Sequence, residues 1–97
     1  MNVEYHPAVQ QELEAARTFY EDRAPGLGEQ FIEEFERQVF RIAATPRRWM
    51  VLQQDIRRSL MSRFPYVIYF RTPGANRIRI TVVKHQRRHP ARGLDRS

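Results

Sequence analysis

The hydrophobic pattern of the chain changes its period once, near Thr45 and Pro46, and this change constrains the fold more than any other feature. Before this point apolar residues recur every three or four positions, the spacing of one face of an α-helix. After it, apolar and polar residues alternate or form short β-branched and aromatic runs, which is typical of β-strands. The pattern favours an α+β fold in which helices cover one face of a sheet.

Two helices are predicted in the first half. The first begins near Pro7, whose missing N–H has no acceptor in a first helical turn, and ends at the sequence APGLG, residues 24–28. The second spans about residues 29–44 and ends before Pro46. Glu12 and its polar neighbours are expected to face outward on the first helix. The positions expected to face inward are Val9, Leu13, Ala16, Tyr20, Phe31, Phe35, Val39 and Ile42.

Four strands are predicted around this helical hairpin. Residues 2–6 precede it, and residues 56–62, 66–72 and 77–85 follow it, with a hairpin turn at residues 73–76. The order is β-α-α-β-β-β, with the helical hairpin packed on a small, mainly antiparallel sheet. In the last strand, alternation is expected to place three residues inward, namely Ile78, Ile80 and Val82, and Thr81 outward.

Length and composition indicate a single domain over residues 1–97. The chain is 41% hydrophobic and 29% charged, which suits a compact fold, and it has no cysteine for disulfides or thiolate metal sites. No apolar stretch approaches the roughly 20 residues of a membrane-spanning helix, and the N-terminus does not resemble a signal peptide. We therefore expect a cytoplasmic protein with no membrane partner.

Charge is divided unequally along the chain. Residues 1–36 contain nine Asp or Glu and two Arg, a net charge of −7, whereas residues 37–97 contain fifteen Lys or Arg and two Asp, a net charge of +13. All of the basic residues except Lys84 are arginines, whose planar fork of donors matches carboxylate or phosphate. The sequence thus predicts an anionic partner, either acidic protein or nucleic acid. An arginine bias from a GC-rich genome is the alternative.

Many of these cations lie on three successive predicted strands and on the basic C-terminal segment, residues 86–97. Strands that follow one another in a meander are neighbours, so we expect several of the cations to converge on the sheet face or edge that the helices leave uncovered. A solvated tail is the alternative for the C-terminal segment. The residues concerned are Arg57, Arg58, Arg71, Arg79, Lys84, His85, Arg87 and Arg88.

Few residues suit catalysis, and we expect neither a metal site nor a cofactor. His85 and His89 are four apart, but no carboxylate cluster accompanies them. A metal-free ribonuclease would need a base, an acid and cations for the phosphorane, roles open to His85 with Arg71, Arg88 and Lys84. The alternative for His85 is a structural role, in which a side chain at the end of a strand is hydrogen-bonded to the backbone.

Three aromatic residues stand beside these cations. Tyr66 and Tyr69 lie on a predicted strand that faces the helices, which favours core or rim positions over platforms for base stacking. Trp49 either fills an edge of the core or anchors a partner.

Three segments together resemble the RelE/ParE superfamily of toxins from type II toxin–antitoxin, or plasmid stabilisation, systems. They are ARTFYED (residues 16–22), IRRSLMSRFPYVIYFR (residues 56–71) and ITVVKHQRRHP (residues 80–90). The resemblance covers nearly the whole chain and implies the fold predicted above. It also implies a cognate antitoxin with an acidic neutralising segment and a DNA-binding N-terminal domain, and hence a toxin–antitoxin hetero-oligomer.

The superfamily divides by target. RelE-like members cleave mRNA on the ribosome, whereas ParE-like members poison DNA gyrase. A common ending of the family, an aromatic pair soon after the proline, is replaced here by Arg92 and Gly93, and no Tyr or Trp follows Tyr69. The resemblance therefore favours a ParE-like gyrase inhibitor, with a RelE-like ribosome-dependent endonuclease as the alternative. Candidates for the toxic site, catalytic only in a ribonuclease, are Arg58, Arg71, His85 and Arg88. Candidates for contacts with the target or antitoxin are Arg57, Arg79, Lys84, Arg87, Arg92 and Trp49.

Overall fold

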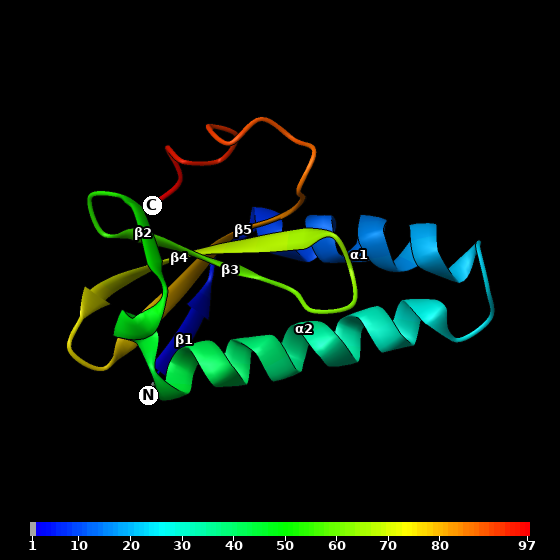
Figure 1. Cartoon of the computed structure of the whole chain (residues 1–97), viewed down its shortest axis with the longest axis horizontal. Coiled ribbons are helices and arrows are strands. Elements are labelled where there is room, and N and C mark those ends of the chain that lie inside the picture. The colour runs from blue at the N-terminus through cyan, green and yellow to red at the C-terminus, as the bar shows by residue number, and fades with distance from the viewer. Residues whose placement is uncertain (1) are drawn as a thin grey trace.

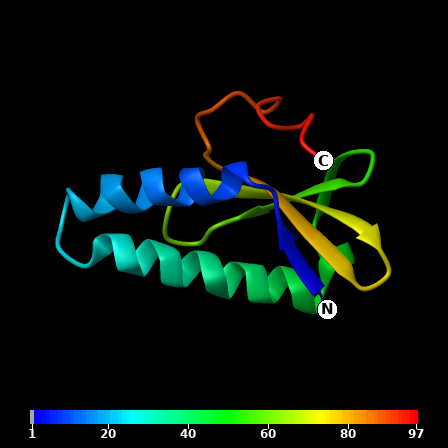
Figure 2. The same ribbon diagram turned by 180° about the vertical axis from the view of Figure 1, so that it is seen from behind.

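The computed structural model describes residues 2–97 and has two layers, a helical hairpin and a twisted sheet. The two helices run side by side along one face of the sheet, as both ribbon views show (Figure 1, Figure 2). The predicted α+β class is confirmed. The elements in chain order are β1 (Asn2–Tyr5), α1 (Ala8–Glu21), α2 (Leu27–Ala44), the 3-10 helix η1 (Pro46–Arg48), β2 (Met50–Gln53), β3 (Ile56–Leu60), β4 (Tyr66–Gly74) and β5 (Arg77–His85).

The sheet has five strands in the order β1-β5-β4-β3-β2. β1 pairs parallel with β5, Asn2 lying opposite Arg77, and all other neighbours are antiparallel. The first strand of the chain therefore lies beside the last, and β4 occupies the centre. This position explains why β4 is apolar on both faces, as its sequence predicted.

β2 is an additional strand that the sequence pattern did not predict. It is four residues long, and three of the four are exposed, so it lacks the alternation that marks a half-buried strand. Its strand geometry comes from antiparallel pairing with β3, Met50 lying opposite Arg58 and Val51 opposite Arg57.

A β-bulge in β5 reverses part of the predicted alternation. Phe70 lies opposite Ile80 and Tyr69 opposite Val82, so Thr81 is an extra residue without a partner in β4. As a result Val82 faces away from the helices, and Thr81, predicted to face outward, is buried with its Oγ1 donating to the Tyr69 carbonyl at 3.3 Å. The predicted inward orientation of Val82 was wrong because an inserted residue shifts the period of two by one.

Two hydrophobic cores result, one on each face of the sheet. The main core lies between sheet and helices, and its fully buried residues include Phe31, Ile42, Ile68, Phe70 and Ile80. The second core lies on the opposite face and consists of Ile56, Val67, Tyr69 and Val82, with Leu52 and Leu94 packed against it.

α2 begins two residues earlier than predicted because the hairpin loop is fixed by α1. Gly26 adopts a left-handed φ of 86°, which glycine accepts without steric cost. The Glu21 carboxylate then accepts hydrogen bonds from the N–H groups of Gly26 at 2.9 Å and Gly28 at 3.0 Å, satisfying donors that an N-terminus leaves free.

Candidate functional site

The C-terminal segment, residues 86–97, folds back over the sheet face that the helices leave uncovered (Figure 1). Lys84 in β5 holds it there, because its Nζ lies 4.3 Å from the Tyr69 ring centroid and donates to three carbonyl oxygens of the segment. The Tyr69 hydroxyl donates to one of the same oxygens at 2.9 Å. Burial lowers the pKa of Lys84, with a smaller opposing effect from the negative charge of Glu12. The three acceptors belong to His89 at 2.8 Å, Pro90 at 3.1 Å and Arg92 at 2.9 Å.

Arg71 and Arg79 hold the far end of the same segment. Arg71 Nε donates to the Arg96 carbonyl at 3.0 Å, and Arg79 Nε donates to the Ser97 carbonyl at 2.8 Å. Arg71 also forms an ion pair with Asp55. These arginines and Lys84 therefore have structural partners inside the chain, and the segment is an ordered cover rather than a solvated tail.

The expected convergence of cations on this face is correct for some residues and wrong for Arg57. Arg58 lies opposite Tyr69 and shares its face. Arg57 lies opposite Phe70, on the helical side, where its Nη1 donates to the carbonyls of Arg47 at 3.2 Å and Trp49 at 2.8 Å. Trp49 is half-buried and packs against the main core, so it occupies a core edge.

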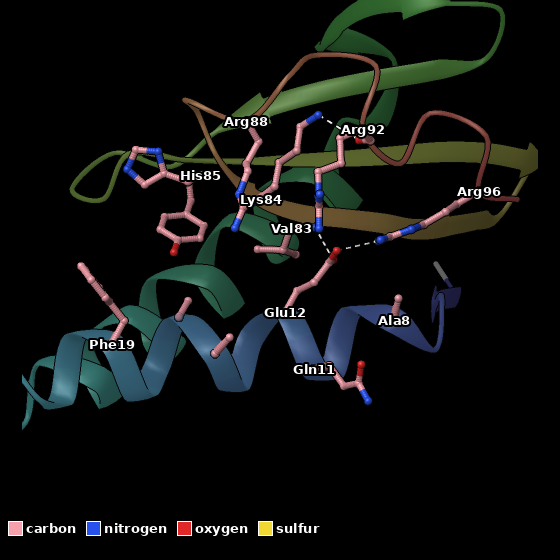
Figure 3. Close-up of a pocket in the computed structure, with 13 residues that line it drawn as sticks. Ala8, Gln11, Glu12, Phe19, Val83, Lys84, His85, Arg88, Arg92 and Arg96 are labelled. Atoms are coloured by element: carbon pink, nitrogen blue, oxygen red, sulfur yellow. Dashed lines mark hydrogen bonds and ion pairs between the residues drawn. The ribbon is translucent and has the colours of Figure 1, made fainter.

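A groove separates α1 from the end of β5 and the C-terminal segment, and we call it the α1–β5 groove (Figure 3). Its volume is about 420 Å³. On the α1 side, Ala8, Ala15 and Ala16 leave room because their side chains are small. On the other side stand Lys84, His85, Arg88, Arg92 and Arg96.

Glu12 of α1 projects into the α1–β5 groove and joins its two walls (Figure 3). Because β1 ends at Tyr5, the last residues of β5 have no neighbouring strand on this side, and the Val83 N–H donates instead to Glu12 Oε1 at 3.0 Å. Glu12 Oε2 accepts from Arg96 Nη1 at 2.8 Å. The prediction that Glu12 faces outward was wrong. The sequence does carry a signal for this contact. Glu12 lies on the same helical face as Ala8 and Ala16, whose small side chains leave space for a neighbouring element.

His85 and Tyr66 lie together at one end of the groove, their ring centroids 5.4 Å apart in an edge-to-face arrangement. His85 Nδ1 accepts a hydrogen bond from the Arg87 N–H at 3.0 Å, as the structural alternative for this residue expected. A neutral imidazole that accepts at Nδ1 carries its proton on Nε2. Burial raises the pKa of the Tyr66 hydroxyl, with a smaller opposing effect from Arg88.

Three of the candidate cations are both exposed and free of carboxylate partners. Arg87, Arg88 and Arg92 are exposed, and none of them takes part in the ion pairs found within residues 2–97. Arg88 and Arg92 line the α1–β5 groove, and Arg87 directly precedes Arg88 in the chain, so the charge of all three is available to an external anion.

In the part of the chain that the structure describes, no three His, Asp or Glu side chains are grouped as metal ligands. Among the residues described, no helix is long and apolar enough to cross a membrane.

Comparison with known proteins agrees with this architecture. Residues 3–90 match the family model described as the ParE toxin of type II toxin–antitoxin system, parDE. A solved structure described as the chromosomal ParDE TA system from P. aeruginosa superposes with a TM-score of 0.76 at 17% sequence identity, covering 88% of this chain and 95% of that one. A comparison with curated protein sequences gives no match. Since the family model spans most of the sequence and the fold agrees, the chain belongs to the ParE toxin family of type II toxin–antitoxin systems.

Proposed function

We propose that this toxin inhibits DNA gyrase and that a cognate antitoxin neutralises it. Membership of the ParE family supports a toxin of this class. The exposed cations Arg87, Arg88 and Arg92 supply a surface for an anionic region of the target, because guanidinium groups pair with carboxylates through two parallel hydrogen bonds.

The hydrogen bond from the Arg87 N–H to His85 Nδ1 is the observation that most favours an inhibitor over a ribonuclease. A general base needs a nitrogen that is free of a proton and faces the substrate. In His85 one ring nitrogen, Nδ1, is already occupied by a hydrogen bond from the backbone. Tyr66 is no substitute, since its raised pKa keeps the phenol protonated at neutral pH.

A gyrase supercoiling assay tests the proposal. Purified toxin, gyrase, ATP and relaxed plasmid are combined, and we expect loss of supercoiled product or accumulation of cleaved DNA at micromolar toxin or below. Replacing Arg87, Arg88 and Arg92 together by Gln should raise the concentration needed for inhibition by about tenfold or more, because several charge-assisted contacts are lost at once.

The control for that triple variant is Arg37→Gln, which removes an exposed arginine from α2 and should leave inhibition unchanged. Normal supercoiling with no cleaved DNA at any toxin concentration would contradict gyrase as the target. If the triple substitution left inhibition unchanged, the surface that contacts gyrase would lie outside the C-terminal segment.

The antitoxin part of the proposal rests on the charge and shape of the toxin. An acidic antitoxin segment would pair with cations beside the α1–β5 groove, while apolar side chains bound along the helical hairpin would supply most of the affinity, since exposed ion pairs contribute only about 0.2–1 kcal/mol each. The product of a neighbouring reading frame should co-purify with the toxin and raise its melting temperature as its concentration increases. If the melting temperature of the toxin stayed constant as that product was added, the product would not be its antitoxin.

A ribosome-dependent mRNA endonuclease is the second candidate, favoured by the proximity of His85, Tyr66 and Arg88 around one groove. Primer extension on ribosome-bound message would then give new 5′ ends in the decoding site, and His85→Ala would remove them. We expect no such ends, because His85 Nδ1 is occupied by the Arg87 N–H and is not free to accept a proton from the substrate.

A further inference from the structure

A second cavity lies at the C-terminal end of α2, where the chain turns through η1 toward β2. We call it the α2-end cavity. Its volume is about 380 Å³, and its lining residues are Arg41, Ala44, Thr45, Arg48 and Trp49. None of these residues lines the α1–β5 groove, so the two sites are separate.

Two buried donors beside this cavity have no hydrogen-bond acceptor within residues 2–97. They are the indole Nε1 of Trp49 and the Nε of Arg57. Buried N–H groups in folded proteins almost always have a partner, and an unpaired one costs about 1–3 kcal/mol. Both atoms are shielded from solvent, so a ligand in the open cavity meets the arginine side chains that line it rather than these two donors. The Arg57 side chain is fixed in place, since its Nη1 donates to the Trp49 carbonyl at 2.8 Å.

The charges around the α2-end cavity are also uncompensated. Neither Arg41 nor Arg48 takes part in an ion pair among the residues described. Arg41 donates one long hydrogen bond, 3.4 Å to Gln38 Oε1, which leaves most of its five N–H groups free. The helix dipole explains a cation such as Arg41 in the last turn of α2. It does not explain Arg48, which lies beyond the helix in η1.

We propose that the α2-end cavity binds a phosphate group of a nucleotide or nucleic-acid strand. Phosphate offers acceptor oxygens in several directions and matches the guanidinium fork, so Arg41 and Arg48 can each donate to it from a different element. Trp49 adds an aromatic wall, and the cavity has room for more than the phosphate itself. This site is independent of gyrase inhibition, because it uses none of the three arginines assigned to that role.

Trp49 is the only tryptophan of the chain, so all tryptophan fluorescence comes from a residue that lines this cavity. Purified toxin is titrated with inorganic phosphate, with thymidine 5′-monophosphate and with a short oligothymidylate, each against sodium chloride at equal ionic strength. We expect a saturable change in Trp49 emission and a saturable change in the position of the single indole N–H signal in a proton–nitrogen NMR spectrum. The tightest of the three probes identifies the source of the phosphate.

Arg41→Gln combined with Arg48→Gln should weaken binding by about tenfold or more, because charge-assisted hydrogen bonds are lost from both walls. Both side chains are exposed, so the fold should survive, and circular dichroism verifies that it does. The matched control is Arg37→Gln, one turn earlier on α2 and outside the cavity, which should bind as the unsubstituted chain does. The proposal is overturned if no phosphate compound gives a saturable change, if chloride gives the same change, or if the double variant binds with unaltered affinity.

Discussion

Lys84 connects the sheet to the C-terminal segment through a single ammonium group. A residue that the sequence offered as a contact for the target or antitoxin proves to donate three hydrogen bonds within the chain. Arg71 and Arg79 are engaged in a similar way. The sequence could not distinguish these cations from Arg87 or Arg88, because all of them are basic residues in or after the same strands. What separates them is the path of the last twelve residues, which has no periodic signal.

Replacing Lys84 by Met should lower the free energy of unfolding by about 1–3 kcal/mol, since carbonyl groups of the C-terminal segment lose their donor. Urea denaturation followed by circular dichroism measures the change. Arg88→Met is the control, an exposed neighbour expected to shift stability by less than about 0.5 kcal/mol. Equal stability of the two variants would mean that water replaces the ammonium group at no cost.

Tyr69 gives stability a dependence on alkaline pH. Burial raises its pKa above the ordinary 10.0, so the folded chain keeps a proton that the unfolded chain loses. Stability is therefore complete below about pH 10 and falls as pH rises further. Tyr69→Phe should show a shallower fall in melting temperature above about pH 10 than the unsubstituted chain. Identical slopes in the two proteins would contradict a raised Tyr69 pKa.

At the scale of elements, the C-terminal segment depends on one glycine for its close contact with β5. Gly93 has a left-handed φ of 85°, and a Cβ built on it would overlap the side chain of Val82. Gly93→Ala should lower the free energy of unfolding by about 1–3 kcal/mol. Gly74→Ala is the matched control, because its Cβ would meet no atom nearer than 3.8 Å and should change stability by less than about 1 kcal/mol. Similar losses in the two variants would show that glycine flexibility, not contact with Val82, decides the effect.

The helices and strands differ in how well the sequence predicts them. Both helices and β4 were predictable because each buries a continuous stripe or run, and that burial imposes the pattern. β2 and the bulge at Thr81 were not, since each arises from pairing with a neighbouring strand rather than from its own residues. Glu12 was missed for a related reason. A glutamate on a helix is expected to face solvent, unless the neighbouring element is known to offer an unpaired N–H that its carboxylate can accept.

At the scale of the whole molecule, opposite charges are segregated between layers. Most of the acidic residues lie on the helical hairpin, and most of the basic ones lie on the sheet, in η1 and in the C-terminal segment. The net charge of +6 and this asymmetry create a field that guides anionic partners. The association rate with the proposed antitoxin should therefore fall by about tenfold or more as salt rises from about 0.05 to about 0.5 M. Stopped-flow mixing measures it, and a rate independent of salt would rule out electrostatic guidance.

The pairing of β1 with β5 also sets when the toxin can become active during its own synthesis. Asn2 finds its partner at Arg77, so β1 leaves the ribosome long before the strand that completes its edge of the sheet exists. Residues 77–97, which hold β5 and the cationic wall of the groove, are synthesised after both helices. Chains fold as units once their elements are available. This edge of the sheet and the groove beside it therefore cannot form until β5 has been made, so the surface that we assign to the target is among the last parts of the fold to assemble.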